Sequence, residues 1–282
     1  MLKYFIVLLA ALGLVVEEVA AGAWTQAAGS GYFKLGTQWV RGKGFREENG
    51  RKVTIPTLAD YTTSLYGEYG LRDNLTLVGY MPFFKRITLN KQVGRPSGFV
   101  YFEGDDISGL GDAQLGLRYR LAQLAATTLS AELAVGLPLG DDTQPNGLLT
   151  GDGEANQQLT LKLGRSFYPA PSYINVDLGF NNRIKGYSDE YLYAVEVGYT
   201  FRGRLTAILH LRGTESLSNG DDGVSGGMGG LYANNQSYLT FGPELIVALG
   251  EDAGLSLSAA HTARAENALE APVLAVGFFL KR

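Results

Sequence analysis

From residue 31 onward, apolar and polar residues alternate over runs of roughly ten residues, as they do in β-strands with one apolar face. Twelve such runs recur, at 31–40, 60–71, 74–86, 112–121, 127–138, 157–168, 172–183, 190–202, 205–215, 237–249, 254–264 and 271–281. After the first 23 residues, no sustained stretch combines helical spacing of apolar residues with a capping residue at its start. We therefore expect an all-β fold of about twelve strands.

The connections between these runs alternate in length. Short turns lie at 72–73, 122–126, 169–171, 203–204 and 250–253. Most of the other connections are longer, at 42–59, 87–111, 139–156, 184–189, 216–236 and 265–270. This alternation is typical of a single transmembrane, antiparallel, up-and-down β-barrel in an outer membrane, whose short turns are periplasmic. An even number of strands then predicts that both termini are periplasmic.

Most charged residues of these runs share one parity, so they are expected on one face of the sheet; Lys85, on the other parity, lies at a strand end, where a membrane interface accepts it. The other parity is apolar, as Leu115, Leu117 and Tyr119 illustrate. The charged parity contains the residues that we expect to line a pore: Lys34, Glu68, Arg118, Arg120, Glu132, Lys162, Asp177, Glu196, His210, Arg212 and Glu244. Counted with Arg183, this face has nearly balanced positive and negative charge, which predicts paired charges rather than an ion-selective pore. A soluble β-sandwich is the alternative fold, but uniform strands and alternating connections favour one closed sheet.

Residues 1–23 have the features of a signal peptide. Lys3 precedes an apolar run from Tyr4 to Val16, and Ala21-Gly22-Ala23 offers a cleavage site of small residues. The run is shorter than the ~20 residues that a membrane-spanning helix needs. A buried N-terminal helix is the alternative. We expect residues 24–282 to form one outer-membrane barrel in a Gram-negative cell, with membrane lipid, lipopolysaccharide and the barrel-insertion machinery as partners.

Composition narrows the functional classes further. The 282 residues include 38 glycines and no cysteine, so thiolate metal sites, disulfides and a lipid-modified cysteine are excluded. A sequence pI near 5.3 argues against nucleic acid as a partner. Glycines within strands let a barrel wall bend. Aromatic residues near the strand ends predict two membrane girdles, made of Tyr69, Tyr119, Tyr199 and Phe201 and of Trp39, Phe83, Tyr191 and Tyr238.

Candidate chemistry is sparse. The two histidines, His210 and His261, accompany neither a Gly-x-Ser-x-Gly elbow nor a Ser-His-Asp pattern. We expect no catalytic residue, no metal site and no cofactor, although His261 on the apolar parity leaves a membrane-embedded lipid enzyme as a minor alternative. Acidic residues in the long connections, such as Asp221 and Asp222, are interpreted as solvated loop tips, with a cation bridge to lipopolysaccharide as the alternative.

Short motifs resemble a known family. They are Gly104-Asp105-Asp106-Ile107-Ser108-Gly109-Leu110-Gly111-Asp112, Gly136-Leu137-Pro138-Leu139-Gly140-Asp141, and Ala23-Trp24-Thr25-Gln26 leading into Gly31-Tyr32-Phe33-Lys34-Leu35. They are similar to motifs of the outer-membrane barrels called the meta-pathway phenol-degradation family. The resemblance implies a transporter-like role for small hydrophobic or aromatic compounds and transfers no binding residue. The chain departs from the usual barrel pattern because it ends in Lys281-Arg282 rather than in an aromatic residue.

These patterns together predict passive passage of small solutes through the barrel, with the connection 87–111 as a candidate constriction. The second hypothesis is a structural or adhesin-like barrel whose lumen is closed by its charge pairs and which acts through its loops.

Overall fold

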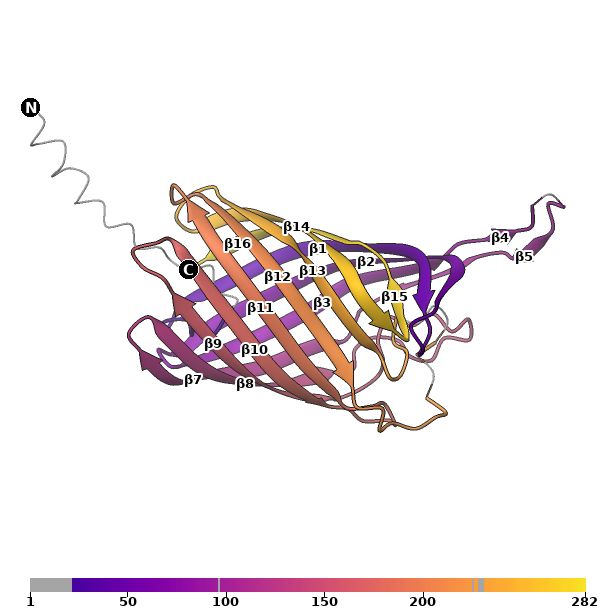
Figure 1. Ribbon diagram of the computed structural model, residues 1–282, viewed down its shortest axis with the longest axis horizontal. Helices are drawn as coiled ribbons and strands as arrows, with labels where there is room; N and C mark the ends of the chain where they lie inside the picture. Colours follow the sequence, from indigo (N-terminus) through magenta and orange to yellow (C-terminus); the bar gives the residue numbers. More distant parts are fainter. Residues whose placement is uncertain (1–21, 96, 225, 228–230) are drawn as a thin grey trace, which may run out of the picture.

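The computed structural model describes residues 22–282 except 96, 225 and 228–230. Within these residues, twelve long strands form a closed antiparallel barrel (Figure 1). They are β1 (Gly31–Arg46), β2 (Lys52–Arg72), β3 (Leu75–Leu89), β7 (Ala113–Leu124), β8 (Thr127–Leu137), β9 (Gln157–Ser166), β10 (Ser172–Asn182), β11 (Glu190–Phe201), β12 (Leu205–Ser216), β13 (Ser237–Ala248), β14 (Ala253–Glu266) and β16 (Val273–Lys281). The predicted fold and all twelve predicted strands are confirmed.

The predicted signal peptide lies, up to residue 21, outside the described residues. Within the described part of the chain there is no helix long and apolar enough to cross a membrane.

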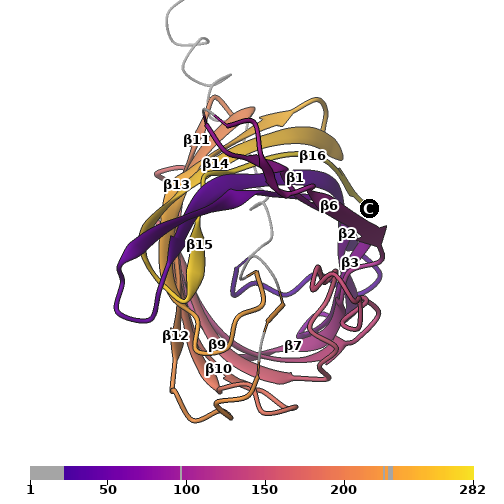
Figure 2. The same cartoon turned by 90° about the vertical axis from the view of Figure 1, so that its right-hand side faces the viewer.

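The barrel closes where its first and last long strands meet. β1 pairs with β16 from Tyr32↔Lys281 to Val40↔Val273, and its other edge pairs with β2. Figure 2 looks onto the end that carries the long loops and shows the strands as a ring, with loop segments reaching over its opening. Closure pairs the backbone groups of every long strand on both sides, which a membrane interior requires.

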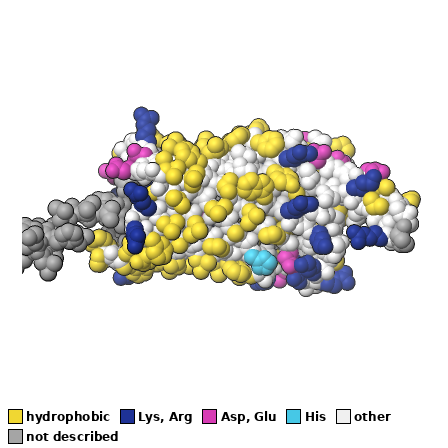
Figure 3. Space-filling view, turned by 90° about the horizontal axis from the view of Figure 1, so that it is seen from above, with side chains coloured by type: hydrophobic (Ala, Val, Ile, Leu, Met, Phe, Trp, Pro, Cys, Tyr) yellow, Lys and Arg dark blue, Asp and Glu magenta, His cyan; other side chains and the backbone are white. Residues whose placement is uncertain are grey.

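The outer surface of the wall is apolar. Leu115, Leu117 and Tyr119 are between 45% and 49% exposed, and apolar side chains of the other long strands are exposed in the same way. On the face that Figure 3 shows, hydrophobic side chains cover the middle of the barrel and charged side chains gather toward its two ends. A soluble β-sandwich would bury this face in a core. The predicted apolar outer face is therefore confirmed, and the sandwich alternative is wrong.

One residue of the predicted aromatic girdles was assigned to the wrong face. Tyr238 has the same parity as the inward-facing Glu244 on β13, and its register partner on β12 is the buried Thr214. The register between β12 and β13 contains no shift between these positions, so Tyr238 points into the barrel.

Short strands extend the wall at the long-loop end. β6 (Asp105–Gly109) pairs with the outer part of β3, and β15 (Ala268–Glu270) pairs with β1. β4 (Gln92–Val93) and β5 (Val100–Phe102) form a hairpin that projects away from the barrel (Figure 1).

Most of the connection 87–111, the candidate constriction, does not lie across the lumen. Its first residues, 87–89, belong to β3 and include the buried Ile87 and Leu89, a later part continues the wall as β6, and β4 and β5 form the projecting hairpin. Near the tip of the hairpin, Phe99 and Tyr101 are 62% and 69% exposed. Pairing of β6 with β3 directs the chain along the barrel wall instead of across its opening.

Candidate functional site

The charged side chains on the inner face are paired. Register places Arg118 of β7 opposite Glu132 of β8, and Lys162 of β9 opposite Asp177 of β10. The Nζ atom of Lys162 lies 2.7 Å from Oδ2 of Asp177. The pairing predicted from balanced charge is confirmed, and it offsets part of the cost of removing these groups from water.

Arg118 is the centre of one buried cluster and is only 2% exposed. Its Nη2 lies 2.9 Å from Glu68 Oε1, and its Nε donates to Glu132 Oε2 at 2.8 Å. The Tyr66 hydroxyl also donates to Glu68. Two carboxylates from β2 and β8 therefore share one guanidinium, which fixes the spacing of these strands around β7.

His210 joins three strands on another part of the wall. Its Nδ1 lies 3.2 Å from Glu196 Oε2 on β11, and its Nε2 lies 2.9 Å from Glu244 Oε2 on β13. Glu244 also accepts a hydrogen bond from Lys34 Nζ at 2.8 Å, and Arg212 Nη2 lies 3.4 Å from His210 Nδ1. Both ring nitrogens are engaged, so His210 acts as a bridge in this wall.

The predicted pore residues therefore fall into two groups. Among the described residues, ten of the eleven contact another member of the set, as the ion pairs and hydrogen bonds above show. Arg120 is the exception: it is half-buried near the tight turns, where its backbone N–H donates to Asn74 O at 2.9 Å. That solutes pass along these side chains stays a prediction.

The segment 22–30 lies inside the barrel at the end with the tight turns, which the sequence did not predict. The Trp24 ring meets Tyr173 of β10 edge to face, with 5.9 Å between ring centroids. The Gln26 amide donates to Glu68 Oε2 of β2 at 2.8 Å. Because β2 and β10 lie on different sides of the ring of strands, the segment crosses the lumen.

Main-chain atoms anchor this segment to the wall. Arg118 Nη1 donates to the Trp24 carbonyl at 3.0 Å, and the Ala28 N–H donates to Asp73 Oδ1 at 2.9 Å. Such contacts depend on backbone groups that every residue has, so the residue pattern of the segment does not reveal them. The residues on the wall that hold the segment, Arg118 and Asp73, are visible in the sequence, but their main-chain partners at Trp24 and Ala28 are not.

The loop 138–156 covers the opposite end and is pinned at its base. The Asp112 carboxylate accepts from the N–H groups of Gly140 at 2.8 Å and Asp152 at 2.7 Å, so it closes the loop on itself. Arg183, just beyond β10, has its Nη2 2.8 Å from Asp152 Oδ2. The loop is therefore held in one conformation by a carboxylate and a guanidinium from the barrel rim.

Glu154 completes this base and is almost fully buried. Its Oε2 accepts from Arg183 Nε and its Oε1 from the Ile184 N–H, each at 2.6 Å. Burial raises the pKa of Glu154 to about 7, because lost hydration outweighs the attraction of the Arg183 guanidinium. The base of the loop therefore titrates near neutral pH.

The same loop packs an apolar side chain against β2 and β3. Leu148 packs against Leu58 of β2 and against Ile87 and Leu89 of β3, and all four are at most 3% exposed. We call these four residues the apolar seal. Partly buried apolar neighbours surround the seal, namely Ile55, Phe102, Ile107, Leu231, Tyr232 and Leu269.

Tyr232, in the connection between β12 and β13, ties this loop to the wall. Its hydroxyl donates to the Thr150 carbonyl at 2.9 Å and accepts from Lys85 Nζ. Lys85 Nζ in turn lies 3.3 Å from Asp60 Oδ2, and the Thr62 hydroxyl donates to Asp60 at 2.6 Å. Two loops are thereby joined to each other and to β2 and β3.

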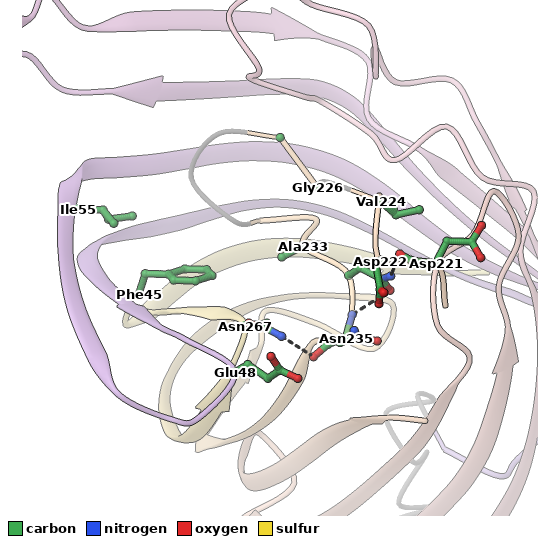
Figure 4. A pocket seen from close by; sticks show the side chains of 12 residues that line it. Phe45, Glu48, Ile55, Asp221, Asp222, Val224, Gly226, Ala233, Asn235 and Asn267 are labelled. Atoms are coloured by element: carbon green, nitrogen blue, oxygen red, sulfur yellow. Dashed lines mark hydrogen bonds between the residues drawn. The ribbon is translucent and has the colours of Figure 1, made fainter. Parts of the chain in front are cut away.

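A cavity of about 530 Å³ opens beside these loops (Figure 4). Phe45 and Ile55 line it on the side of the β1–β2 hairpin, and the exposed Asp221 and Asp222 lie on the opposite side. The cavity is thus a mixed apolar and acidic vestibule at the long-loop end.

The remaining histidine lies on the outer face. His261 meets Phe241 edge to face, with 6.1 Å between ring centroids. The described residues contain no group of three or more His, Cys, Asp or Glu side chains that could hold a metal ion.

Comparison with known proteins supports the fold. No family model and no curated protein sequence matches the chain. The COG4313 outer membrane channel from Pseudomonas putida F1 is similar, with a TM-score of 0.71 and 17% identity over 93% of this chain and 99% of that one. The NanC porin is similar with a TM-score of 0.55 and 8% identity, covering 88% of this chain and 98% of that one. The chain therefore has the fold of outer-membrane channels and porins.

Proposed function

We propose that this protein is an outer-membrane channel for the passive passage of small molecules and that it is not an enzyme. The observation that carries the proposal is a closed barrel with an apolar outer wall and an interior lined by paired charges. The fold shared with outer-membrane channels supports it. In this proposal the tight turns and both chain termini face the periplasm, and the long loops face outward.

The substrates that we propose are small hydrophobic or aromatic molecules, as the resemblance to the meta-pathway phenol-degradation family implies. The apolar seal at the long-loop end supports this substrate class, because an apolar molecule can contact it without losing hydrogen bonds to water.

Uptake by whole cells tests the proposal. Intact lipopolysaccharide slows the entry of the uncharged aromatic dye N-phenyl-1-naphthylamine into cells. The fluorescence of this dye rises in apolar surroundings, so its entry can be followed over time. We expect cells displaying the protein to take up the dye several-fold faster than vector-only cells. De-energisation of the cells should not slow this uptake, because the passage is passive. Unchanged resistance to a large hydrophilic antibiotic controls for general membrane damage. Equal dye uptake at verified surface abundance would contradict the proposal.

A closed structural or adhesin-like barrel is the second candidate. The segment 22–30 across one end and the pinned loop 138–156 over the other favour it. This candidate predicts that surface display leaves dye uptake unchanged, so the same experiment separates the two.

A further inference from the structure

We propose that the apolar seal is the selectivity filter of the channel, with Leu148 as the residue that determines specificity. Uncharged apolar molecules cross the seal, whereas ions and strongly hydrated solutes are stopped there. This inference rests on the proposed function and adds the place and the chemical basis of selection.

Water does not reach the four side chains of the seal in this conformation. Leu58 and Leu148 are 0% exposed, Ile87 is 1% exposed and Leu89 is 3% exposed. An ion that entered this contact would lose its hydration and find no polar partner on these four side chains. An apolar solute would replace one apolar contact by another, so its passage carries no such penalty. Hydrophobic constrictions stop ions in channels by the same exclusion of water.

The barrier to ions is confined to this layer on β2. The inward positions that follow Leu58 along this strand are Asp60, Thr62, Ser64, Tyr66 and Glu68. Several of them form hydrogen bonds or ion pairs with their neighbours, such as Thr62 with Asp60 and Arg118 with Glu68. A solute beyond the seal therefore meets a polar wall that tolerates charge.

Hydrogen bonds and an ion pair hold the backbone of the loop 138–156, so we assign the selection of solutes to the Leu148 side chain. Asp112 and Arg183 hold the base of the loop, and Tyr232 holds the Thr150 carbonyl next to the seal. A rotation of the Leu148 side chain needs none of these bonds to break. The filter can thus admit a small solute while the loop stays in place.

The absence of cysteine from the chain permits a direct test by thiol labelling. Ser64→Cys places a near-isosteric probe six residues beyond Leu58 on β2, about 20 Å along an extended strand. Ser97→Cys, at the exposed hairpin, is the freely accessible reference. Porin-deficient cells that display each variant are treated with three methanethiosulfonate reagents. All three react with thiols in the same way, but they carry an uncharged benzyl, a cationic trimethylammonium-ethyl or an anionic sulfonatoethyl group.

With Leu148 present, we expect the benzyl reagent to modify Ser64→Cys at least tenfold faster than either charged reagent, after division by the rates at Ser97→Cys. Leu148→Ser should reduce this preference at least fivefold, and so should the milder Leu148→Ala. Leu148→Met should retain it. Leu139→Ser is the matched control, because Leu139 lies in the same loop but is 45% exposed. Resistance of each folded barrel to detergent on gels verifies folding.

Two results would overturn the proposal in distinguishable ways. If the charged reagents reach Ser64→Cys as readily as the benzyl reagent, or if Leu148→Ser and Leu148→Ala leave the preference unchanged, the seal is not the filter, although the channel stands. If no reagent reaches Ser64→Cys while Ser97→Cys is labelled, no path leads inward and the proposed function fails as well.

Discussion

Arg118 holds together parts of the barrel that are far apart in the sequence. Its guanidinium contacts carboxylates on β2 and β8, and it also binds the Trp24 carbonyl of the segment inside the lumen. The Arg118 side chain is only 2% exposed. Removal of its charge would therefore leave Glu68 and Glu132 without this cationic partner in a site that water barely reaches. Loss of one member of a buried ion cluster costs far more than the pair contributes.

Arg118→Met should therefore destabilise the barrel by about 3–5 kcal/mol, the range for a buried charge left uncompensated. Urea unfolding in lipid vesicles, followed by tryptophan fluorescence, measures this change. Arg120→Met is the matched control on the same strand and should shift stability by less than about 1 kcal/mol, because Arg120 is half-buried outside the charge cluster. An equal loss of unfolding free energy in the two variants would contradict the stabilising role assigned to Arg118.

Glu154 makes the packing of the loop 138–156 depend on pH. Its pKa of about 7 in the packed loop is higher than the ordinary 4.5, so the packed loop binds more protons between these values. Packing therefore weakens as pH rises from about 4.5 to about 7, and is constant below and above that window with respect to this group.

We expect backbone amides near Leu148 to have higher protection factors against hydrogen exchange at pH 5 than at pH 8. Glu154→Gln removes the titrating group and should abolish most of this difference, whereas Glu103→Gln, at the exposed hairpin, should preserve it. A difference of the same size in Glu154→Gln would assign the pH dependence to other groups. Mass spectrometry of exchanged peptides gives the measurement.

At the scale of strands, alternation predicts an element only where its two faces meet different surroundings. It located all twelve long strands because one face of each is apolar and exposed while the other is inward and polar. It missed the outer end of β1, where Arg41, Lys43 and Arg46 occur on both parities. Beyond the apolar band both faces are wet, so no period-2 signal remains there.

The candidate site was predictable to the same extent. The inward charges were found by parity, and their pairing followed from their balance. The seal was not found, because Leu148 sits in a connection without periodicity and its neighbours, Leu58 and Ile87, come from other elements. The pinning of the loop by Asp112 depends on backbone N–H groups, which carry no sequence signature.

The projecting hairpin offers a prediction at this scale. Replacement of residues 93–100 by a short Gly-Ser turn should leave dye uptake within about twofold of the unaltered protein, because this part of the hairpin lies outside the lumen and leaves Phe102 in place. The measurement is the whole-cell dye assay at matched surface abundance. A more than fivefold loss of dye uptake would contradict this prediction and would show that solutes contact the hairpin.

At the scale of the whole molecule, the barrel is a wall with two unlike ends. One end is crossed by a segment of the chain held through polar hydrogen bonds, and the other is covered by a loop that carries an apolar contact. The uniform strands and the alternating lengths of their connections predicted the closed wall, but the arrangement of either end depends on contacts between residues far apart in the sequence.

The seam between β1 and β16 also sets the order of assembly. Tyr32 pairs with Lys281, so this contact joins the first and last long strands and closes a loop that contains all the others. Until β16 is in place, β1 and the newest strand expose unpaired edges that can capture other chains. Ring closure is therefore expected to be the slow step of biogenesis, and a helper that shields these two edges would act on its rate rather than on the stability of the finished barrel.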